Sequence, residues 1–289
     1  DHEGNAVHNE LTYLFVQSIV HTRMAYPGIG LCVHDETPDD LLDLAVDMLS
    51  RGYSHPAIFN DEAITRGLLE LGIPERDACN YVHSSCVEIT LCAQSSCWVF
   101  SPNINTPQLF LDVMREVSEM MTRACEGIVT LFGSKAVPGM YSYLRHVTEG
   151  EKTPATPDGR RAHTPLAAAS SPVQGRDVSG PTASILSSTC WNQLPFMGGV
   201  AINLKFQPQG AATRKSMKAV IKTSMARGGL QLQVNCVSRE DLLDARANPD
   251  KHRDLLVRIG GYSDYFTSLS PGMQDEIVNR TEQDISDTK

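Results

Sequence analysis

Residues 256–266 read Leu256-Val257-Arg258-Ile259-Gly260-Gly261-Tyr262-Ser263-Asp264-Tyr265-Phe266. An adjacent pair of glycines separates a β-type run from an aromatic cluster in this stretch. The common meaning of such a glycine is a turn or a β-bulge. A second meaning is a need for backbone without a side chain, because glycine alone has no Cβ.

An unpaired electron on a backbone α-carbon would create that need. Such a radical is delocalised between the flanking amide nitrogen and the carbonyl group, which requires a planar α-carbon, and a Cβ would crowd that plane. Gly261 is therefore a candidate site for a backbone radical. A turn glycine is the alternative.

A second informative stretch reads Ser85-Cys86-Val87-Glu88. Side chains two positions apart point to the same side of an extended segment, so Cys86 and Glu88 would line one pocket. A cysteine S–H bond is close in strength to an activated substrate C–H bond, which suits Cys86 to exchange hydrogen atoms. The ordinary alternatives are a buried, inert cysteine and a solvated surface glutamate.

The two stretches together resemble the glycyl radical enzymes, the superfamily of pyruvate formate-lyase and the radical dehydratases. Further sequence motifs that resemble the family lie on either side of these two stretches and through the middle of the chain. They include Phe59-Asn60-Asp61, Asn103-Ile104-Asn105, Thr156-Pro157-Asp158-Gly159-Arg160-Arg161, Gly175-Arg176-Asp177, Gln274-Asp275-Glu276-Ile277 and Arg280-Thr281-Glu282. The resemblance thus covers nearly the whole chain.

The resemblance implies a role for each candidate residue. Gly261 would store the unpaired electron as a protein-derived cofactor, and Cys86 would abstract hydrogen from a small-molecule substrate. Glu88 would act as a general base on a substrate hydroxyl. A separate radical S-adenosylmethionine activase would install the radical on Gly261, and a homodimer is typical of the family.

The residues around Cys86 narrow the reaction class. Pyruvate formate-lyase has two adjacent cysteines, whereas Cys86 lies between Ser85 and Val87. The Cys-x-Glu arrangement therefore resembles the dehydratase and lyase branch, which cleaves C–O or other C–X bonds. An arylacetate-type radical decarboxylase is one alternative. A non-catalytic repair component, which would need only the Gly261 segment, is another.

Two departures from the family bear on the substrate. Ser85 stands where family members usually have glycine, and Ile89 stands where diol dehydratase-like members have proline. Both weaken the case for a polyol substrate. Family chains are also longer, so the sequence resembles the C-terminal part of such a protein, and the substrate and leaving group stay open.

Composition fits a cytoplasmic enzyme that binds neither nucleic acid nor membrane. The 289 residues carry a formal net charge of −9, which disfavours polyanionic partners. No apolar run approaches the length of a membrane span, and residues 1–5 lack signal-peptide character. The eight cysteines form no C-x-x-C pair, so we expect no metal in this chain.

Helical and strand patterns alternate along the chain, which predicts an α/β fold. The expected helices are 38–51, capped by Thr37, and 61–71, 109–132, 214–227 and 239–247; the expected strands are 200–206 and 230–235. The resemblance implies a partial glycyl-radical-type α/β barrel in which the Cys86 and Gly261 loops meet in the interior. We expect residues 1–150 to carry the cysteine loop and residues 151–289 to form the glycine radical region.

Overall fold

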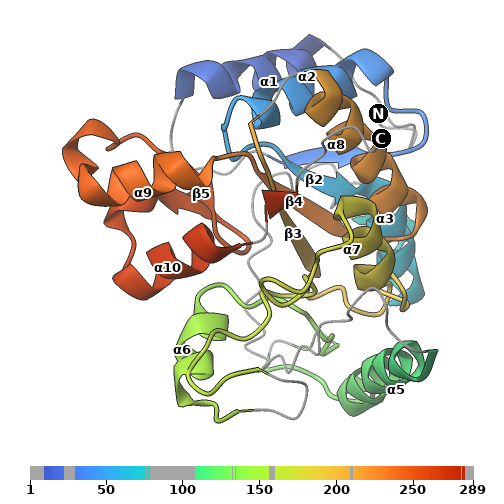
Figure 1. The fold of residues 1–289 in the computed structure, drawn as a ribbon. Helices are drawn as coiled ribbons and strands as arrows, with labels where there is room; N and C mark the ends of the chain where they lie inside the picture. The colour runs from blue at the N-terminus through green and yellow to red at the C-terminus, as the bar shows by residue number, and fades with distance from the viewer. Residues whose placement is uncertain are drawn as a thin grey trace.

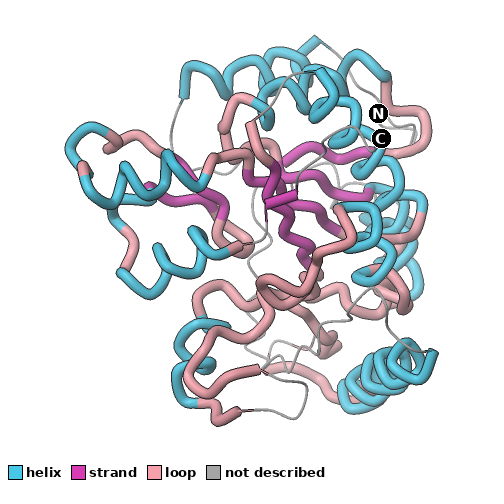
Figure 2. The backbone as a smooth tube through the Cα atoms, viewed as in Figure 1, coloured by secondary structure: helices cyan, strands magenta, loops and turns pink. Residues whose placement is uncertain are grey.

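A computed structural model describes residues 10–22, 30–75, 77–78, 108–131, 133, 135–155, 160–208, 211–280 and 282–283. A five-stranded sheet forms its centre (Figures 1 and 2). The strands follow the order β1 (Gly30–Val33), β2 (Ala57–Asn60), β4 (Gln231–Asn235), β3 (Ala201–Phe206) and β7 (Glu282–Gln283). Neighbouring strands are parallel except β2 and β4, which are antiparallel.

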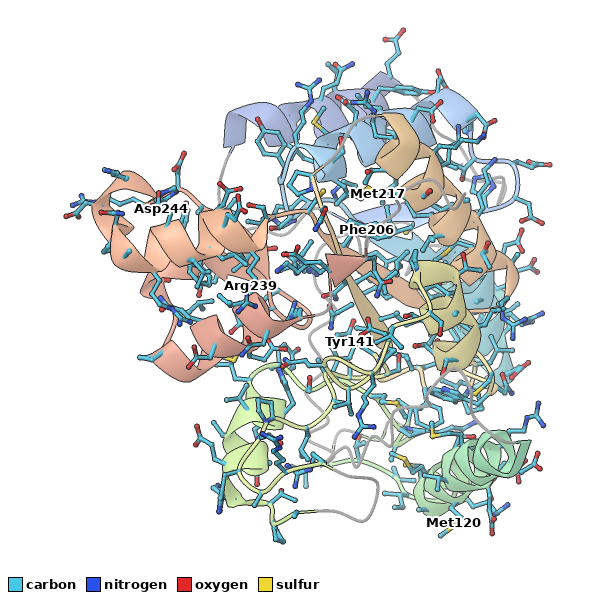
Figure 3. The ribbon with its side chains drawn as sticks, in the orientation of Figure 1. Met120, Tyr141, Phe206, Met217, Arg239 and Asp244 are labelled. Carbon is cyan, nitrogen blue, oxygen red and sulfur yellow. The ribbon has the colours of Figure 1, made fainter. Side chains whose placement is uncertain are left out.

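Helices cover one face of this sheet (Figure 1). They are α1 (Glu10–Thr22), α2 (Asp39–Ser50), α7 (Pro181–Ser188) and α8 (Ala211–Ala226). Ile202, Leu204 and Phe206 of β3 pack there in one apolar core with Leu232 and Val234 of β4. Figure 3 shows Phe206 and Met217 together in this helix-covered part of the molecule.

The opposite face of the sheet, which we call the inner face, is polar along β3 and β4. Successive strand residues point to opposite sides, so the odd-numbered positions of β3 and β4 lie there. They include Asn203, Lys205, Gln231, Gln233 and Asn235, and the strand register places Asn203 beside Gln233 and Lys205 beside Asn235. The inner face therefore offers amide groups at the centre of the sheet.

A second unit lies to one side of the sheet, and we call residues 237–280 the glycine lobe (Figure 1). It contains α9 (Arg239–Ala247), α10 (Pro271–Asn279), the short helices η1 (Pro249–Lys251) and η2 (Phe266–Ser268), and an antiparallel hairpin of β5 (Leu256–Arg258) and β6 (Ser263–Tyr265). The lobe has its own apolar core, which includes Leu242, Val257, Ile259, Phe266 and Ile277. Its core is separate from the core between the sheet and the helices.

Three more helices complete the described elements: α3 (Asp61–Glu70), α5 (Gln108–Cys125) and α6 (Arg145–Lys152). Within the part of the chain that the structure describes, no helix is both long enough and apolar enough to span a bilayer. The loop-rich stretch between α6 and α7 runs back along β3, where Ser170 and Ser171 bond to the strand backbone.

Most predicted elements are confirmed. The helix at 239–247 has the predicted bounds, and both predicted strands form. Asn60 caps α3 by accepting a hydrogen bond from the Ala63 amide, as capping asparagines do. The division into 1–150 and 151–289 stays a prediction; the central sheet combines strands from both ranges.

Two details of the predicted helices are wrong. The helix predicted to reach Phe132 ends at Cys125, because Gly127 takes a left-handed φ of +75° and Val129 pairs with Lys135. Thr37 does not cap α2: Pro38 occupies the cap position, and the Thr37 hydroxyl accepts a hydrogen bond from the His34 amide instead.

Candidate functional site

Gly261 lies in the loop between β5 and β6, where its φ of +105° is a conformation that side-chain-bearing residues rarely adopt. A Cβ built on Gly261 would lie 3.1 Å from Tyr141 Cε1 and 3.2 Å from Tyr143 Cε1. Gly260 differs, since its φ is not left-handed and a Cβ there would come no closer than 3.4 Å, to the Tyr143 carbonyl. A side chain is therefore strongly disfavoured at Gly261, and more so than at Gly260.

Three tyrosines surround this glycine. The rings of Tyr141 and Tyr143 are stacked with centroids 5.9 Å apart, and Tyr262 lies 6.1 Å from Tyr143. The Tyr141 hydroxyl donates a hydrogen bond to Gln231 Oε1 on the inner face. Burial raises the pKa of Tyr141 above its ordinary value, so its phenol stays neutral near pH 7.

Tyr141 is fixed from its other side by a second glycine. Gly199 has a φ of +106°, and a Cβ on it would overlap the Tyr141 ring. The backbone of Met140 also pairs with the segment before β3. Figure 3 shows Tyr141 near the start of β3, well away from Phe206. The ring is thus held between Gly199 and Gly261.

Both polar backbone groups of Gly261 are hydrogen bonded. Its amide donates to Gln233 Oε1 at 3.1 Å, and its carbonyl accepts from Arg258 Nη2 at 3.0 Å. Arg258 Nε donates to the same Gln233 oxygen at 3.1 Å, and its Nη1 donates to Ser263 Oγ at 3.2 Å. The Gly261 amide and Arg258 Nε are both donors, so the oxygen of the Gln233 side-chain amide must face them. Arg258 and Gln233 are both buried.

Further contacts tie β5 to the sheet. The Asn235 amide pairs with the backbone of Arg258, donating to its carbonyl at 2.7 Å and accepting from its N–H at 2.6 Å. Arg280 donates to the carbonyls of Arg258 and Ile259, each at 2.7 Å. The loop that carries Gly261 is therefore held by side chains from β4 and from the residue that follows α10.

Arg280 belongs to a buried charged cluster. Its guanidinium binds both carboxylate oxygens of Glu276, and His146 Nε2 of α6 lies 3.3 Å from Glu276 Oε1. Desolvation acts to raise the pKa of Glu276, but the charge of Arg280 and the contact with His146 outweigh it and lower the pKa to about 2. Glu276 is therefore ionised at neutral pH and anchors α10 to α6.

The structure places one of the three predicted site residues. Gly261 has the setting given above, whereas Cys86 and Glu88 lie outside the described residues, within 79–107. Their approach to Gly261 stays a prediction. Among the cysteines that the structure describes, burial raises the pKa of Cys236 to about 12 and also raises that of Cys190, so neither thiol is poised as a thiolate.

Sequence reasoning did not identify Tyr141, Gln233 or Asn235 as site residues. An available signal was the alternation Gln231-Leu232-Gln233-Val234-Asn235 in one strand. Strands covered by helices on both faces are apolar at nearly every position, so regularly spaced amides indicate a polar interior on one side. No group of three or more potential metal ligands occurs among the described side chains.

Two family models match the chain. A model described as "Pyruvate formate lyase-like" matches residues 1–140, and one described as "Glycine radical" matches residues 166–267. The first range includes Cys86 and Glu88, and the second includes Gly261. Together the two models cover most of the chain.

The chain is similar to a number of curated proteins and solved structures. The probable dehydratase YbiW of Escherichia coli (strain K12) is 44% identical over 154 residues, which are 52% of this chain and 19% of YbiW. The 4-hydroxyphenylacetate decarboxylase glycyl radical subunit of Clostridioides difficile is 32% identical over 187 residues, covering 63% of this chain and 21% of that protein. The glycerol-bound B12-independent glycerol dehydratase of Clostridium butyricum superposes with a TM-score of 0.85 at 20% identity, over 98% of this chain and 56% of that chain.

The structural likeness shows the fold: the predicted α/β architecture is that of the radical dehydratase barrel, of which this chain spans little more than half. Gly261, which has the left-handed φ, lies in the segment that the glycine radical model matches. The two family models, which together cover most of the chain, show that it belongs to the glycyl radical enzymes.

Proposed function

We propose that this protein is a radical lyase in which Gly261 holds an unpaired electron and Cys86 takes hydrogen from a small substrate. The setting of Gly261 carries the proposal. Its left-handed φ disfavours other residues, ring carbons of Tyr141 and Tyr143 lie 3.1 and 3.2 Å from where a Cβ would be, and its amide and carbonyl are both hydrogen bonded. These features fit a backbone radical, which needs an α-carbon that can become planar without a side chain crowding it.

The proposed reaction uses Cys86 and Glu88 together. Cys86 passes its thiol hydrogen atom to Gly261 and then removes a hydrogen atom from a substrate carbon that carries a hydroxyl. Glu88 accepts the hydroxyl proton as a general base. The leaving group departs from the adjacent carbon with its bonding electron pair, and that carbon then regains a hydrogen atom from Cys86. The substrate is dehydrated or loses another heteroatom group.

Two observations support a lyase over a repair component, and a third argues against acyl transfer. The matched family models include one over 1–140, and a repair component would need only the segment around Gly261. The relative YbiW is named a probable dehydratase. The single thiol of residues 85–88 also lacks the second cysteine that acyl transfer would need.

A radical decarboxylase is the second candidate, because a relative at 32% identity is named a 4-hydroxyphenylacetate decarboxylase subunit. The products separate the two candidates. A lyase releases water or a heteroatom leaving group and forms a carbonyl product, whereas a decarboxylase releases carbon dioxide and forms none.

The proposal includes partners. A radical S-adenosylmethionine activase would remove the α-hydrogen of Gly261, and a homodimer is the expected assembly by analogy with the family. We place the reaction in the cytoplasm, since radical chemistry of this kind suits a reducing compartment.

Anaerobic activation followed by electron paramagnetic resonance tests the proposal. The whole protein should give a doublet that disappears in Gly261→Ala, with turnover on a panel of small hydroxylated substrates. Cys86→Ala should keep the doublet and lose turnover, whereas Cys125→Ala, at the half-buried end of α5, should keep both. Turnover that survives Cys86→Ala would refute the relay, and a doublet that survives Gly261→Ala would refute the radical site.

A further inference from the structure

We propose that Gln233 and Arg258 polarise the two peptide units that flank the Gly261 α-carbon, and so stabilise the unpaired electron electronically as well as holding the loop. This inference rests on the proposed function, since it concerns the radical that Gly261 would carry. We call these two residues the polarising pair. They act on opposite sides of the same α-carbon.

The chemistry follows from how such a radical is delocalised. When the Cα–H bond of Gly261 breaks, the hydrogen atom leaves with one electron and the other stays on the α-carbon. The amide nitrogen donates electron density into this half-filled orbital, and the carbonyl group withdraws density from it. A group that accepts the N–H hydrogen bond makes the nitrogen a better donor. A cation that donates to the oxygen makes the carbonyl a better acceptor.

The polarising pair applies both effects in the favourable direction. Gln233 Oε1 accepts from the Gly261 amide at 3.1 Å, and the Arg258 guanidinium donates to the Gly261 carbonyl at 3.0 Å. A hydrogen bond from a charged donor is stronger than one from a neutral donor. The two residues are also bonded to each other, because Arg258 Nε donates to the same Gln233 oxygen at 3.1 Å.

Burial increases the effect of these contacts. Gln233 is 1% exposed and Arg258 is 4% exposed, so both side chains are largely removed from water, while Gly261 itself is half-buried. In an interior of low effective dielectric, linked hydrogen bonds polarise one another. The Tyr141 and Tyr143 rings close a further side of the glycine. The contacts to both peptide units therefore come from protein groups of fixed position.

A purely structural role for the same residues predicts a different result. If they only held the loop, a variant that kept the fold would leave the spin distribution on Gly261 unchanged. If they polarise the peptide units, they lower the spin density on the α-carbon by spreading it to nitrogen and oxygen. The splitting of the doublet by the remaining α-hydrogen reports that spin density directly.

The test compares the doublet in substituted forms of the activated whole protein. Gln233→Glu keeps an acceptor and makes it a stronger one, so the splitting should narrow. Gln233→Leu removes the acceptor, so the splitting should widen. Gln231→Glu is the matched control and should leave the splitting unchanged. The Gln231 side chain also lies on the inner face of β4, but it is bonded to the Tyr141 hydroxyl and not to Gly261.

A second measurement needs only the unsubstituted protein. In protein labelled with ¹⁵N-arginine, pulsed electron paramagnetic resonance should detect hyperfine coupling between the radical and a guanidinium nitrogen, since Arg258 Nη2 donates a hydrogen bond to the Gly261 carbonyl. The inference would be overturned if this coupling were absent. It would also be overturned if the doublet splitting were the same in Gln233→Glu, Gln233→Leu and the parent protein. Absence of any doublet in the parent would instead overturn the proposed function, so the two failures are distinguishable.

Discussion

The ring of Tyr141 lies so close to Gly261 that a Cβ on the glycine would be 3.1 Å from Cε1 of the ring. That distance is shorter than an ordinary van der Waals contact between carbon atoms. The ring cannot retreat, because Gly199 lies against its other edge and its hydroxyl is bonded to Gln231. The space beside the α-carbon of Gly261 is thus limited on one side by a fixed aromatic group.

Gly261→Ala should therefore destabilise the loop as well as remove the radical site. The left-handed φ and the contacts with Tyr141 and Tyr143 together should cost about 1–3 kcal/mol. Thermal unfolding of the inactive protein would measure this cost. Gly260→Ala is the control, since its φ is not left-handed and its nearest contact is 3.4 Å; it should change stability less. Equal losses at the two positions would contradict the proposed constraint.

Glu88→Gln should lower kcat by about 10²–10⁴, the usual contribution of a general base, while the Gly261 doublet stays at full intensity. The side-chain amide that replaces the Glu88 carboxylate cannot accept the proton of a substrate hydroxyl. The radical on Gly261 does not depend on that carboxylate. Steady-state kinetics and spin quantification on the same sample measure both quantities. Glu116→Gln, on the exposed side of α5, should leave kcat unchanged. An unchanged kcat in Glu88→Gln would remove Glu88 from the mechanism.

Glu276→Gln should destabilise the protein by about 3 kcal/mol at pH 7, because it leaves the buried Arg280 without its carboxylate partner. The folded-state pKa of Glu276 is about 2, below the ordinary value of 4.5. The stabilisation is therefore complete above pH 4.5 and is lost as the pH falls towards 2.

Chemical denaturation at several pH values would check this dependence. The difference in unfolding free energy between the parent protein and Glu276→Gln should be constant from pH 7 to 5 and shrink at lower pH. A difference that stayed constant down to pH 2, or grew, would mean that the Glu276 carboxylate does not stabilise the fold.

Asn235→Ala should loosen the β5–β6 hairpin. The substitution leaves the buried N–H and C=O of Arg258 without the Asn235 amide, although Arg280 still donates to that carbonyl. An unsatisfied buried group costs about 1–3 kcal/mol, so hydrogen exchange of residues 256–265 should accelerate by about tenfold.

The matched control for this experiment is Asn248→Ala. Asn248 is in the same lobe, and its side chain makes an exposed hydrogen bond to Asp244. Loss of a surface contact of this kind should have little effect on the hydrogen-exchange rates of residues 256–265. Protection that is equal in Asn235→Ala and the parent would show that the Asn235 amide does not hold the hairpin.

Much of the local structure follows from sequence alone. The helix at 239–247 is marked by its capping Ser238 and by two acidic residues in its first turn, and the structure has those bounds. The strands at β3 and β4 follow from β-type residues between helical segments. Helical spacing beyond Cys125 was misleading because the apolar pattern continues where Gly127 ends the helix.

The sequence by itself marked Gly261 as a candidate radical site, carried the motifs that resemble the glycyl radical enzymes and placed amides at alternate positions of residues 231–235. Only the tertiary structure decided which groups surround that glycine. Alternation along a strand shows which side chains share a face, but it does not show which distant loop lies upon it. Gln233, Tyr141 and Gly261 meet because the glycine lobe is hydrogen bonded to the inner face of the sheet, and contacts between such distant segments depend on the packing of the whole fold.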